Sequence, residues 1–311
     1  MKKLDVSSIP GKEDKVKAIT EYLEEGVKNL FNDAAYRDYL TKMSQVYSYS
    51  LNNLLLIFAQ KPDATIVGGM KMWNDTFHRH VNKGEKGIAI LAPVNRSRWI
   101  KVKKTDEDGN AVLDENGEPE MENKRIDYMS FRIVYVFDVS QTDGEPMPVI
   151  GVKELGGCVQ NYDAIMSALV DISGLPVSYE KLDGGVKGYY SREGHIVLNE
   201  GMSETQTLKT MVHELAHSML HNADVLEPGT KSRSSKEVEA ESVAFTVCTY
   251  LGLDTSDYSF TYVGTWAGGL DTKVLMESME TIRKCAADII KKIEETVGCA
   301  AADMGVSEEV A

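Results

Sequence analysis

The sequence predicts an α+β protein of two domains. The first would combine helices with an antiparallel sheet, and the second would be built around a histidine-bearing helix. Helical periodicity followed by short strand-like runs occupies the first half, a segment of linker composition lies at 141–148, and strand-like pieces with long helices follow it. We expect the domains to span residues 1–145 and 150–311. A chain of 311 residues is long enough to bury two hydrophobic cores.

The first domain is expected to begin with helices. Apolar residues recur at helical spacing over 12–43, and the apolar run within 47–60 is long enough to favour a helix over a strand. Strand-like runs follow at 65–67, 87–92, 98–102 and 128–139, with a turn at 82–87. The acidic segment 106–122 is expected to form a hairpin or a mobile insertion on the sheet.

The second domain is expected to contain more helix. The periodicity predicts a helix over 161–173, strand pieces at 176–179 and 188–198, two helices with polar faces, and a long closing helix over 271–297. Residues 203–206 match a capping box that opens the first of the two polar helices. The last dozen residues are expected to form a loose tail.

Residues 211–221 contain the pattern His-Glu-x-x-His within an otherwise apolar helix. Residues four apart share a helix face, so the imidazoles of His213 and His217 can reach one ion. Glu214 can take a proton from a water at that ion. Imidazole suits zinc, and three protein ligands leave one position open for water. The strand-like run 195–198 just upstream matches the edge strand that metallopeptidases place beside the metal.

A third ligand is expected from the helix predicted over 236–248. Glu237 and Glu241 share one face of this helix, whereas Glu239 points away from that face and is the weaker choice. The apolar neighbours indicate that much of the helix is buried. A buried carboxylate needs a proton, a partner or a metal.

Other polar residues near this pattern are not assigned as metal ligands. His221 continues the histidine face but lies too far along the helix to share a tetrahedral ion, so we assign it a structural or supporting role. The zinc-protease pattern with a third histidine six residues after the second is excluded, because position 223 is alanine. The residue that would stabilise an oxyanion is left open among Tyr190, Tyr258 and Tyr262, since packing would also explain a tyrosine at each position.

The two polar helices resemble those of the Glu-type zincins, including the IrrE/ImmA-like metallopeptidases. The resemblance implies that Glu237 is the third metal ligand and that Glu241 supports a zinc-binding histidine. This sequence carries glutamate at 241, where aspartate or asparagine is commoner in such families.

Composition indicates an ordinary globular protein of a reducing compartment. Hydrophobic residues make up 42% and charged residues 26% of the chain. The four cysteines are far apart and form no CxxC pair, which favours free thiols over disulfides or a cysteine metal site. The N-terminus lacks an apolar leader, and no run approaches the ~18 apolar residues of a membrane span. We therefore expect a cytoplasmic protein with no membrane partner.

Charge distribution keeps a nucleic-acid partner open although the net charge is −14. Residues 156–311 hold 12 basic and 24 acidic side chains, whereas residues 65–104 hold nine basic and only two acidic ones. Local field steers a polyanion more than net charge does. Trp73, Phe77 and Trp99 lie in the basic segment, and rings beside cations suit single-stranded nucleic acid. The alternative is that these rings belong to a core and the lysines are merely solvated.

The order of motifs also resembles the N-terminal domain of ArdC-type antirestriction proteins. The matching runs are 47–65, 72–73, 81–93 and 136–142, and with the metallopeptidase segment the resemblance covers roughly residues 15–270. It implies a single-stranded-DNA-binding domain joined to a zincin-like metallopeptidase domain, in proteins of mobile elements that protect incoming DNA from restriction. The predicted DNA contacts are Lys71, Trp73, Arg79, Lys83, Lys86, Arg96, Arg98, Trp99 and Lys101.

The leading hypothesis is a cytoplasmic mobile-element protein that binds single-stranded DNA and carries a Zn2+-dependent peptidase. Its ligands would be His213, His217 and Glu237, with Glu214 as general base and a protein substrate that the sequence does not identify. One alternative is a DNA-masking protein with a structural zinc site. The other is an IrrE/ImmA-like regulatory peptidase that cleaves a repressor-type partner. The acidic segment 106–122 departs from the family pattern and would weaken or reshape the DNA contact.

Overall fold

A computed structural model describes most of the chain. The described residues are 32–105, 111–113, 118–147, 154–155, 158–222, 231–260, 263–268 and 270–297, with a few isolated positions before 32. The expectations for the start of the first helical segment, for much of the acidic segment 106–122, for the end of the linker and for the tail lie outside these residues. By their contacts, the described parts of 1–89 and 135–305 form one compact unit, and those of 90–134 form another.

The helices of the first half begin at polar caps. Helix α2 (Asp33–Gln45) follows Asn32, whose side chain accepts the N–H of Ala35, and α3 (Leu51–Gln60) follows Ser50, which accepts the N–H of Asn53. These caps satisfy N–H groups that have no partner within a helix. The prediction of a helix within 47–60 is confirmed. Eight of the ten residues of α3 are buried, which explains its continuous apolar run.

The strands of the first half form two sheets, and the short helix α4 (Met70–Asp75) contacts β2. In one sheet, β4 lies between β1 and β3, and in the other β2 pairs antiparallel with β5. The bounds are β1 (Val67–Gly68), β2 (Arg79–Val81), β3 (Ile88–Lys103), β4 (Met121–Asp138) and β5 (Thr142–Gly144). The two strands predicted at 87–92 and 98–102 are therefore parts of one strand, β3, which continues through Pro93.

The segment assigned to a linker is partly structural, which corrects the interpretation from composition. Gln141 and Thr142 are buried, and β5 lies within 141–148. Gln141 closes a capping box with Asp138 around the 3-10 helix η2 (Val139–Gln141), and its amide also donates to Glu85 and to the carbonyl of Lys86. Asp138 accepts the N–H of Thr65 at 2.7 Å. These hydrogen bonds hold the turn 82–87 and the residues just before β1 against the end of β4 and the 3-10 helix that follows it.

The second half has the predicted alternation of strands and helices. Strand β10 lies between β8, to which it is parallel, and β9, to which it is antiparallel. Helix α6 begins at Ser203, which accepts the N–H of Gln206, but the Gln206 side chain binds Lys187 and Thr210, so only half of the predicted capping box forms. The bounds are β6 (Glu154–Leu155), β7 (Cys158–Val159), α5 (Tyr162–Ser173), β8 (Val177–Glu180), β9 (Gly188–Ser191), β10 (His195–Asn199), α6 (Glu204–Leu220), α7 (Arg233–Tyr250), α8 (Val263–Ala267) and α9 (Thr272–Val297).

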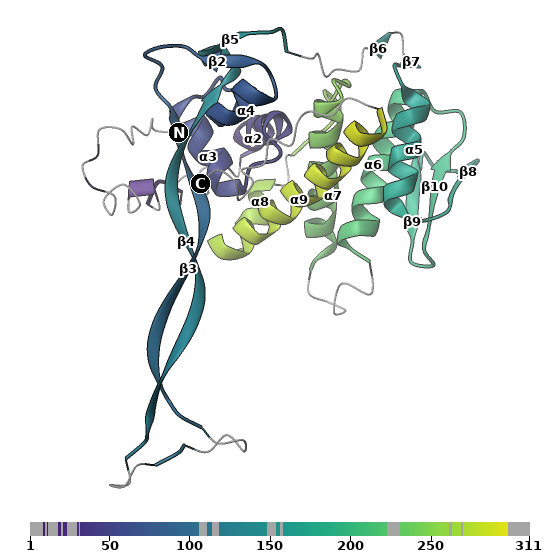
Figure 1. The fold of residues 1–311 in the computed structure, drawn as a ribbon. Coiled ribbons are helices and arrows are strands. Elements are labelled where there is room, and N and C mark those ends of the chain that lie inside the picture. Colours follow the sequence, from purple (N-terminus) through teal and green to yellow (C-terminus); the bar gives the residue numbers. More distant parts are fainter. Residues whose placement is uncertain are drawn as a thin grey trace. The chain divides into compact units, whose positions relative to one another are not determined.

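The helices of both halves share one core. Helix α9 packs against α5 and α7 and contacts α3, while α2 packs against α7 (Figure 1). The hydroxyls of Tyr36 and Ser242 lie 2.9 Å apart, and the hydroxyl of Tyr47 donates to Glu294 at 2.8 Å. The fold is therefore a mixed helix and sheet architecture, as predicted. The domain limits 1–145 and 150–311 remain a prediction. Within the described residues, no helix is both long and apolar enough to cross a membrane.

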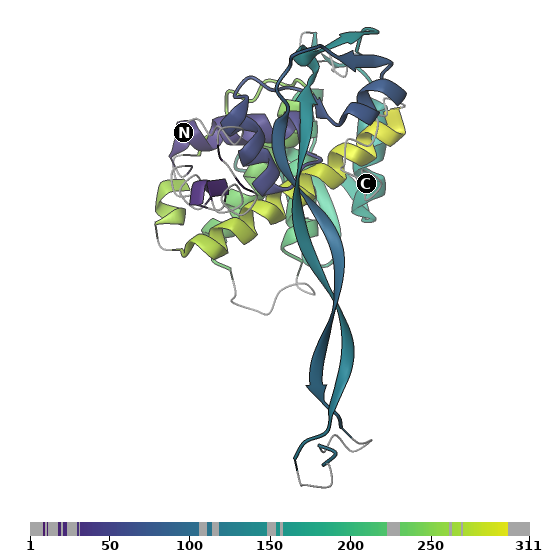
Figure 2. The same ribbon diagram turned by 60° about the vertical axis from the view of Figure 1, so that its left-hand side comes forward.

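The second unit is a hairpin formed by the outer parts of β3 and β4. The two strands twist around each other along their length (Figures 1 and 2). The N–H of Lys104 donates to the carbonyl of Glu120 at 2.8 Å, where the strands end. Large apolar side chains on this hairpin are exposed rather than packed. They include Trp99, Met121, Tyr128, Met129 and Phe131.

Candidate metal centre and nucleic-acid interface

Three side chains from two helices converge at one point of the larger unit. His213 and His217 lie one turn apart on α6, and Glu237 lies in the second turn of α7, which packs beside α6. The Nε2 atoms of the two histidines are 3.1 Å apart, and Glu237 Oε2 lies 3.7 Å from each of them. The sequence spacing therefore brought the two histidines together, and helix packing supplies the carboxylate.

The spacing of these donor atoms suits one tetrahedral ion. Ligands bound at about 2.0–2.1 Å in tetrahedral geometry lie roughly 3.4 Å from one another, and the three observed distances fall on both sides of that value. The neighbouring imidazoles of His213 and His217 hold the pKa of Glu237 far below its usual range, so its carboxylate is ionised. Two imidazoles and one carboxylate can hold a divalent metal here.

A second carboxylate lies next to His213, on the side of the ring away from the cluster. Its Nδ1 lies 3.3 Å from Glu241 Oε2, one turn further along α7 from Glu237. Burial alone would lower the pKa of His213, but the contacts with Glu237 and Glu241 outweigh burial and raise the pKa to about 9. Glu241 thus lies where it can orient one of the two histidines. Its predicted supporting role is consistent with this position and remains a proposal.

His217 is the first member of a longer hydrogen-bonded chain of polar side chains. Its Nδ1 lies 3.0 Å from Nδ1 of His221, and Nε2 of His221 lies 2.9 Å from Glu239 Oε2. Burial alone would raise the pKa of Glu239, but hydrogen bonds from His221, Lys231 and Ser278 outweigh it and lower the pKa. Glu239 is only 1% exposed.

Sequence reasoning missed this contact of Glu239. The helical spacing correctly places Glu239 on another face than Glu237 and Glu241, but it does not identify the residue that Glu239 contacts. The sequence contained one indication of that contact, because His221 lies one turn beyond His217 and would need a polar partner if it were buried. It meets Glu239 only because α6 and α7 pack together.

Glu214 lies beside the metal cluster at the wall of a cleft. Its Oε2 accepts the backbone N–H of Tyr190 on β9 at 2.8 Å, and the side chain is 8% exposed. Burial raises the pKa of Glu214, and the neighbouring His213 and His217 offset only part of that rise. A carboxylate of raised pKa is a stronger base near neutral pH.

The cleft itself has a volume of about 380 Å³ and lies between α6, β9 and the loop before α8. A larger hollow of about 830 Å³ at the start of α3 and α9 contains none of the metal-binding side chains. Gly188 stands at the wall of the smaller cleft, where an added Cβ would lie 2.6 Å from Thr210 and 2.8 Å from the carbonyl of Val197. The residues that line the smaller cleft are Gly185, Lys187, Gly188, Gln206, Lys209, Thr210, His213, Glu214, Glu241, Asp257 and Tyr258.

The tyrosines considered for oxyanion stabilisation have different surroundings. The hydroxyl of Tyr258 donates to Cys248 Sγ at 3.6 Å, and the side chain is buried. Tyr190 contributes its backbone N–H to Glu214. Tyr262 lies outside the described residues. The oxyanion group stays unassigned.

The predicted nucleic-acid contacts are divided between the two units. Trp73 is fully buried, and its Nε1–H donates to the carbonyls of Gly68 and Phe137. A ring enclosed in the core offers no face for a base to stack on, so the predicted DNA contact of Trp73 is wrong. Arg79 is also engaged, because its guanidinium donates to the hydroxyl and the carbonyl of Thr142 and to the carbonyl of Glu145. Arg79 therefore ties β2 to β5.

The remaining predicted contacts are exposed. Lys71 lies on α4, and Lys83 and Lys86 lie in the turn after β2. The hairpin unit holds Arg96, Arg98, Trp99 and Lys101, all on β3. Trp99 is 69% exposed, the most exposed of the large apolar side chains that the structure describes.

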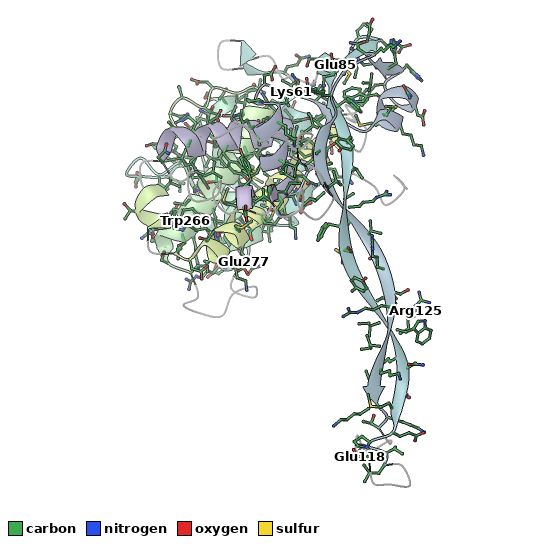
Figure 3. All side chains as sticks on the ribbon, turned by 90° about the vertical axis from the view of Figure 1, so that its left-hand side faces the viewer. Lys61, Glu85, Glu118, Arg125, Trp266 and Glu277 are labelled. Carbon is green, nitrogen blue, oxygen red and sulfur yellow. The ribbon has the colours of Figure 1, made fainter. Side chains whose placement is uncertain are left out.

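Strand β4 adds cations and rings that the sequence reasoning did not include. Lys124, Arg125, Tyr128, Phe131 and Arg132 lie on it, and the guanidinium of Arg98 stands 5.5 Å from the centre of the Tyr128 ring. We call residues 90–104 and 121–134 the stem of the hairpin. Figure 3 shows Arg125 on this stem and Glu118 close to the end of the hairpin.

The stem has eight basic and two acidic side chains, whereas residues 105–120 have seven acidic and no basic ones.

Two protein-family models match the sequence. The model for the N-terminal domain of the anti-restriction factor ArdC matches residues 12–137. The model for an IrrE N-terminal-like domain, of the M78 peptidases, matches residues 171–250. The second match includes α6 and α7 and therefore the whole metal cluster.

Two curated relatives are longer than this chain. An uncharacterized protein of Bacillus anthracis is 28% identical over 285 residues, which cover 82% of this chain and 47% of that protein. DNA primase TraC of Escherichia coli is 27% identical over 230 residues, which cover 70% of this chain and 20% of the primase. The chain thus spans about half the length of the first relative and a fifth of the second.

Two crystal structures of the antirestriction protein ArdC from plasmid R388 match the chain in a comparison with solved structures. The metal-free structure has a TM-score of 0.44 at 21% identity and covers 79% of this chain and 86% of its own. The Mn(II)-bound structure has a TM-score of 0.46 at 18% identity and covers 89% and 97%.

Proposed function

We propose that this chain, in which an ArdC-type N-terminal domain precedes an IrrE N-terminal-like domain, is an antirestriction-type protein with a zinc-dependent peptidase site. The observation that carries the proposal is the convergence of His213, His217 and Glu237 beside the buried carboxylate of Glu214. Donors of this kind and spacing suit zinc, which also leaves a coordination position open in catalytic sites. The divalent metal is supported by the donor set, and its identity as Zn2+ is part of the proposal.

The residues around the cluster have separable tasks. His213, His217 and Glu237 would hold the ion, whose chemistry is to polarise a water and a carbonyl group. Glu214 would take a proton from the attacking water and pass it to the amine that leaves. Its bond from the N–H of Tyr190 fixes the carboxylate at the wall of the cleft. The run 195–198, expected to be the edge strand, is the central strand of its sheet, and β9 forms an edge instead. Strand β9 offers an extended backbone beside which a peptide can lie.

The peptidase proposal is tested by separating metal binding from hydrolysis. Glu214→Gln keeps the acceptor for Tyr190 N–H but removes the base, so it should retain about one zinc per chain and lose ~10²–10⁴-fold in rate. Glu237→Ala and His217→Ala should lose the zinc. The exposed Glu193→Gln is the matched control and should change neither. Zinc is measured by elemental analysis, which also distinguishes manganese.

Hydrolysis is measured by labelling new N-termini in a proteome-derived peptide library, with and without a single-stranded oligonucleotide. New termini that appear with the wild type and not with Glu214→Gln support the peptidase. A zinc-loaded wild type that produces none under either condition would contradict it. That result would leave a DNA-masking protein with a structural metal. Cleavage confined to a repressor-type protein, without DNA affinity, would favour the regulatory peptidase.

We also propose that the hairpin stem is a site for single-stranded DNA. Its six excess positive charges and its exposed rings supply the two elements of sequence-independent binding, phosphate attraction and base stacking. The seven acidic residues of 105–120 would repel the phosphates of the DNA, so that the DNA binds along the stem and not at residues 105–120. Affinity for a labelled oligonucleotide should fall steeply as salt rises. An absence of binding even at low salt would contradict this proposal.

A further inference from the structure

A chain of buried polar groups extends from one proposed metal ligand into the core. It begins at His217 Nδ1, passes through the ring of His221 and ends at the carboxylate of Glu239. The side chains of His221 and Glu239 are 4% and 1% exposed. The other carboxylate oxygen of Glu239 accepts from Lys231 Nζ at 2.6 Å and from the hydroxyl of Ser278 on α9.

Burial makes this chain costly unless every member is satisfied. Removing a carboxylate from water is unfavourable unless charge and hydrogen bonds replace the lost hydration. An apolar side chain would fill the same space at lower cost, and a buried ion pair is weak evidence for a stabilising role. A directional role explains the arrangement better, because the groups are ordered as donors and acceptors.

The direction of the hydrogen bonds follows from the carboxylate. Lys231 and Ser278 both donate to Glu239, and a carboxylate paired with an ammonium group accepts hydrogen bonds, so the nitrogen that faces it, His221 Nε2, carries the hydrogen. In a neutral imidazole the other nitrogen is then an acceptor, and His217 Nδ1 must donate to it across 3.0 Å. His217 Nε2 is left with its lone pair, on the side that faces His213 and Glu237.

We propose that Glu239 and His221 are positioning residues that hold His217 in the tautomer and orientation needed to bind the metal. The inference rests on the proposed metal site and assigns a task to two residues outside the ligand set. The two ligand histidines are then supported differently. His213 faces the carboxylate of Glu241 directly, whereas His217 reaches a buried carboxylate through a second imidazole.

An isosteric change tests the direction of this chain. In Glu239→Gln, Lys231 and Ser278 still require an acceptor, so the amide oxygen should remain on their side and the NH2 should face His221. His221 Nε2 would then accept, its Nδ1 would carry the hydrogen, and His217 would be protonated on Nε2. We expect zinc affinity to fall about 10–100-fold, the usual effect of losing such a supporting group. The control Ser278→Ala removes one donor to Glu239 without reversing the chain.

Two measurements apply to each folded variant. Zinc affinity is determined by competition with a chromophoric chelator, and the protonated nitrogen of each imidazole is read from 15N spectra of the metal-free protein. The spectra do not depend on hydrolysis or on bound metal, so the inference can fail while the peptidase proposal holds, and the reverse. Unchanged affinity, or unchanged protonation sites, in Glu239→Gln would overturn the inference.

A second pair of variants keeps the test decisive if Glu239→Gln does not fold. His221→Gln retains an acceptor for His217 and a donor for Glu239, whereas His221→Leu retains neither. We expect His221→Gln to bind zinc close to wild-type affinity and His221→Leu to bind about 10–100-fold more weakly. Equal affinities in these two variants would show that the ring of His221 only fills space.

Discussion

At the scale of single residues, two tryptophans of the basic segment have opposite environments. Trp73 is enclosed and donates to two carbonyls, whereas Trp99 is mostly exposed on the hairpin. Both lie near cations in the sequence, so composition and spacing assigned both to DNA. The structure retains only Trp99 as a candidate, because a stacking ring must present a free face.

The two tryptophans should therefore respond differently to truncation. We expect Trp73→Ala to lower the free energy of unfolding by about 3–5 kcal/mol, the cost of emptying a large buried site. Trp99→Ala should change stability by less than ~0.5 kcal/mol and weaken oligonucleotide binding by ~1–3 kcal/mol if a base stacks there. Denaturant unfolding and fluorescence anisotropy measure the two effects. Equal stabilities would contradict the burial of Trp73, and unchanged DNA affinity in Trp99→Ala would remove it from the interface.

At the scale of elements, α9 ties the helices of the first half to those that carry the metal cluster. Glu280 accepts the N–H of Leu51 at the start of α3 and the guanidinium of Arg283, and Arg283 donates to the carbonyl of Tyr47. Glu294 lies about three turns further along α9 than Arg283 and accepts the hydroxyls of Tyr47 and Tyr250. The helix α9 is therefore held by apolar packing and by these polar contacts, which fix its position along the neighbouring helices.

The contribution of Glu280 to the free energy of unfolding should depend on pH. Burial alone would raise the pKa of Glu280, but Arg283 and the N–H of Leu51 outweigh burial and lower it. A carboxyl group whose folded pKa is depressed stabilises the fold above its unfolded pKa, about 4.5, and that contribution is lost as pH falls through the folded pKa. We expect Glu280→Gln to lower the free energy of unfolding by about 1–3 kcal/mol at pH 7 and by progressively less below pH 4.5.

Urea unfolding from pH 3 to 7 measures this difference. The exposed Glu277→Gln, on the same helix, is the control and should stay within about 0.5 kcal/mol of wild type at every pH. A Glu280→Gln effect that did not shrink on acidification would show that the contact acts through shape rather than charge.

At the scale of the whole molecule, net charge and local charge point to different partners. The chain carries −14 overall, yet the hairpin stem has a clear excess of basic residues. The proposed functions also lie in different compact units, with the metal cluster in one and the hairpin in the other. They should therefore be separable by substitution.

Replacing Arg98, Lys101 and Lys124 by glutamine should separate them. Each lost phosphate contact lowers the steepness of the log affinity against log salt plot by ~0.7 for single strands, so the triple variant should lose roughly 2 from the slope. Zinc content and hydrolysis should be unchanged. The control replaces Lys181, Lys273 and Lys291, which are exposed in the other unit, and should leave the slope intact. Equal slopes for both triple variants would place the DNA site elsewhere.

Periodicity and caps determined most of the local structure. Helices within 47–60, 161–173, 203–220 and 271–297 and the strand at 195–198 follow from apolar spacing and from capping residues such as Ser203, because helices and strands depend on neighbours in the chain. The same argument places His213 and His217 on one face, since their separation of four residues is a property of the helix itself.

Contacts between distant residues were decided only by the tertiary structure. Periodicity does not show that Trp73 lies in the core, that Gln141 and Thr142 are buried within an apparent linker, or that Tyr36 meets Ser242. The same holds for Glu239, which a helical wheel turns away from the metal and which the packing of α7 against α6 brings to His221. Sequence spacing records which side chains share a face, whereas the partner of that face depends on how the elements pack.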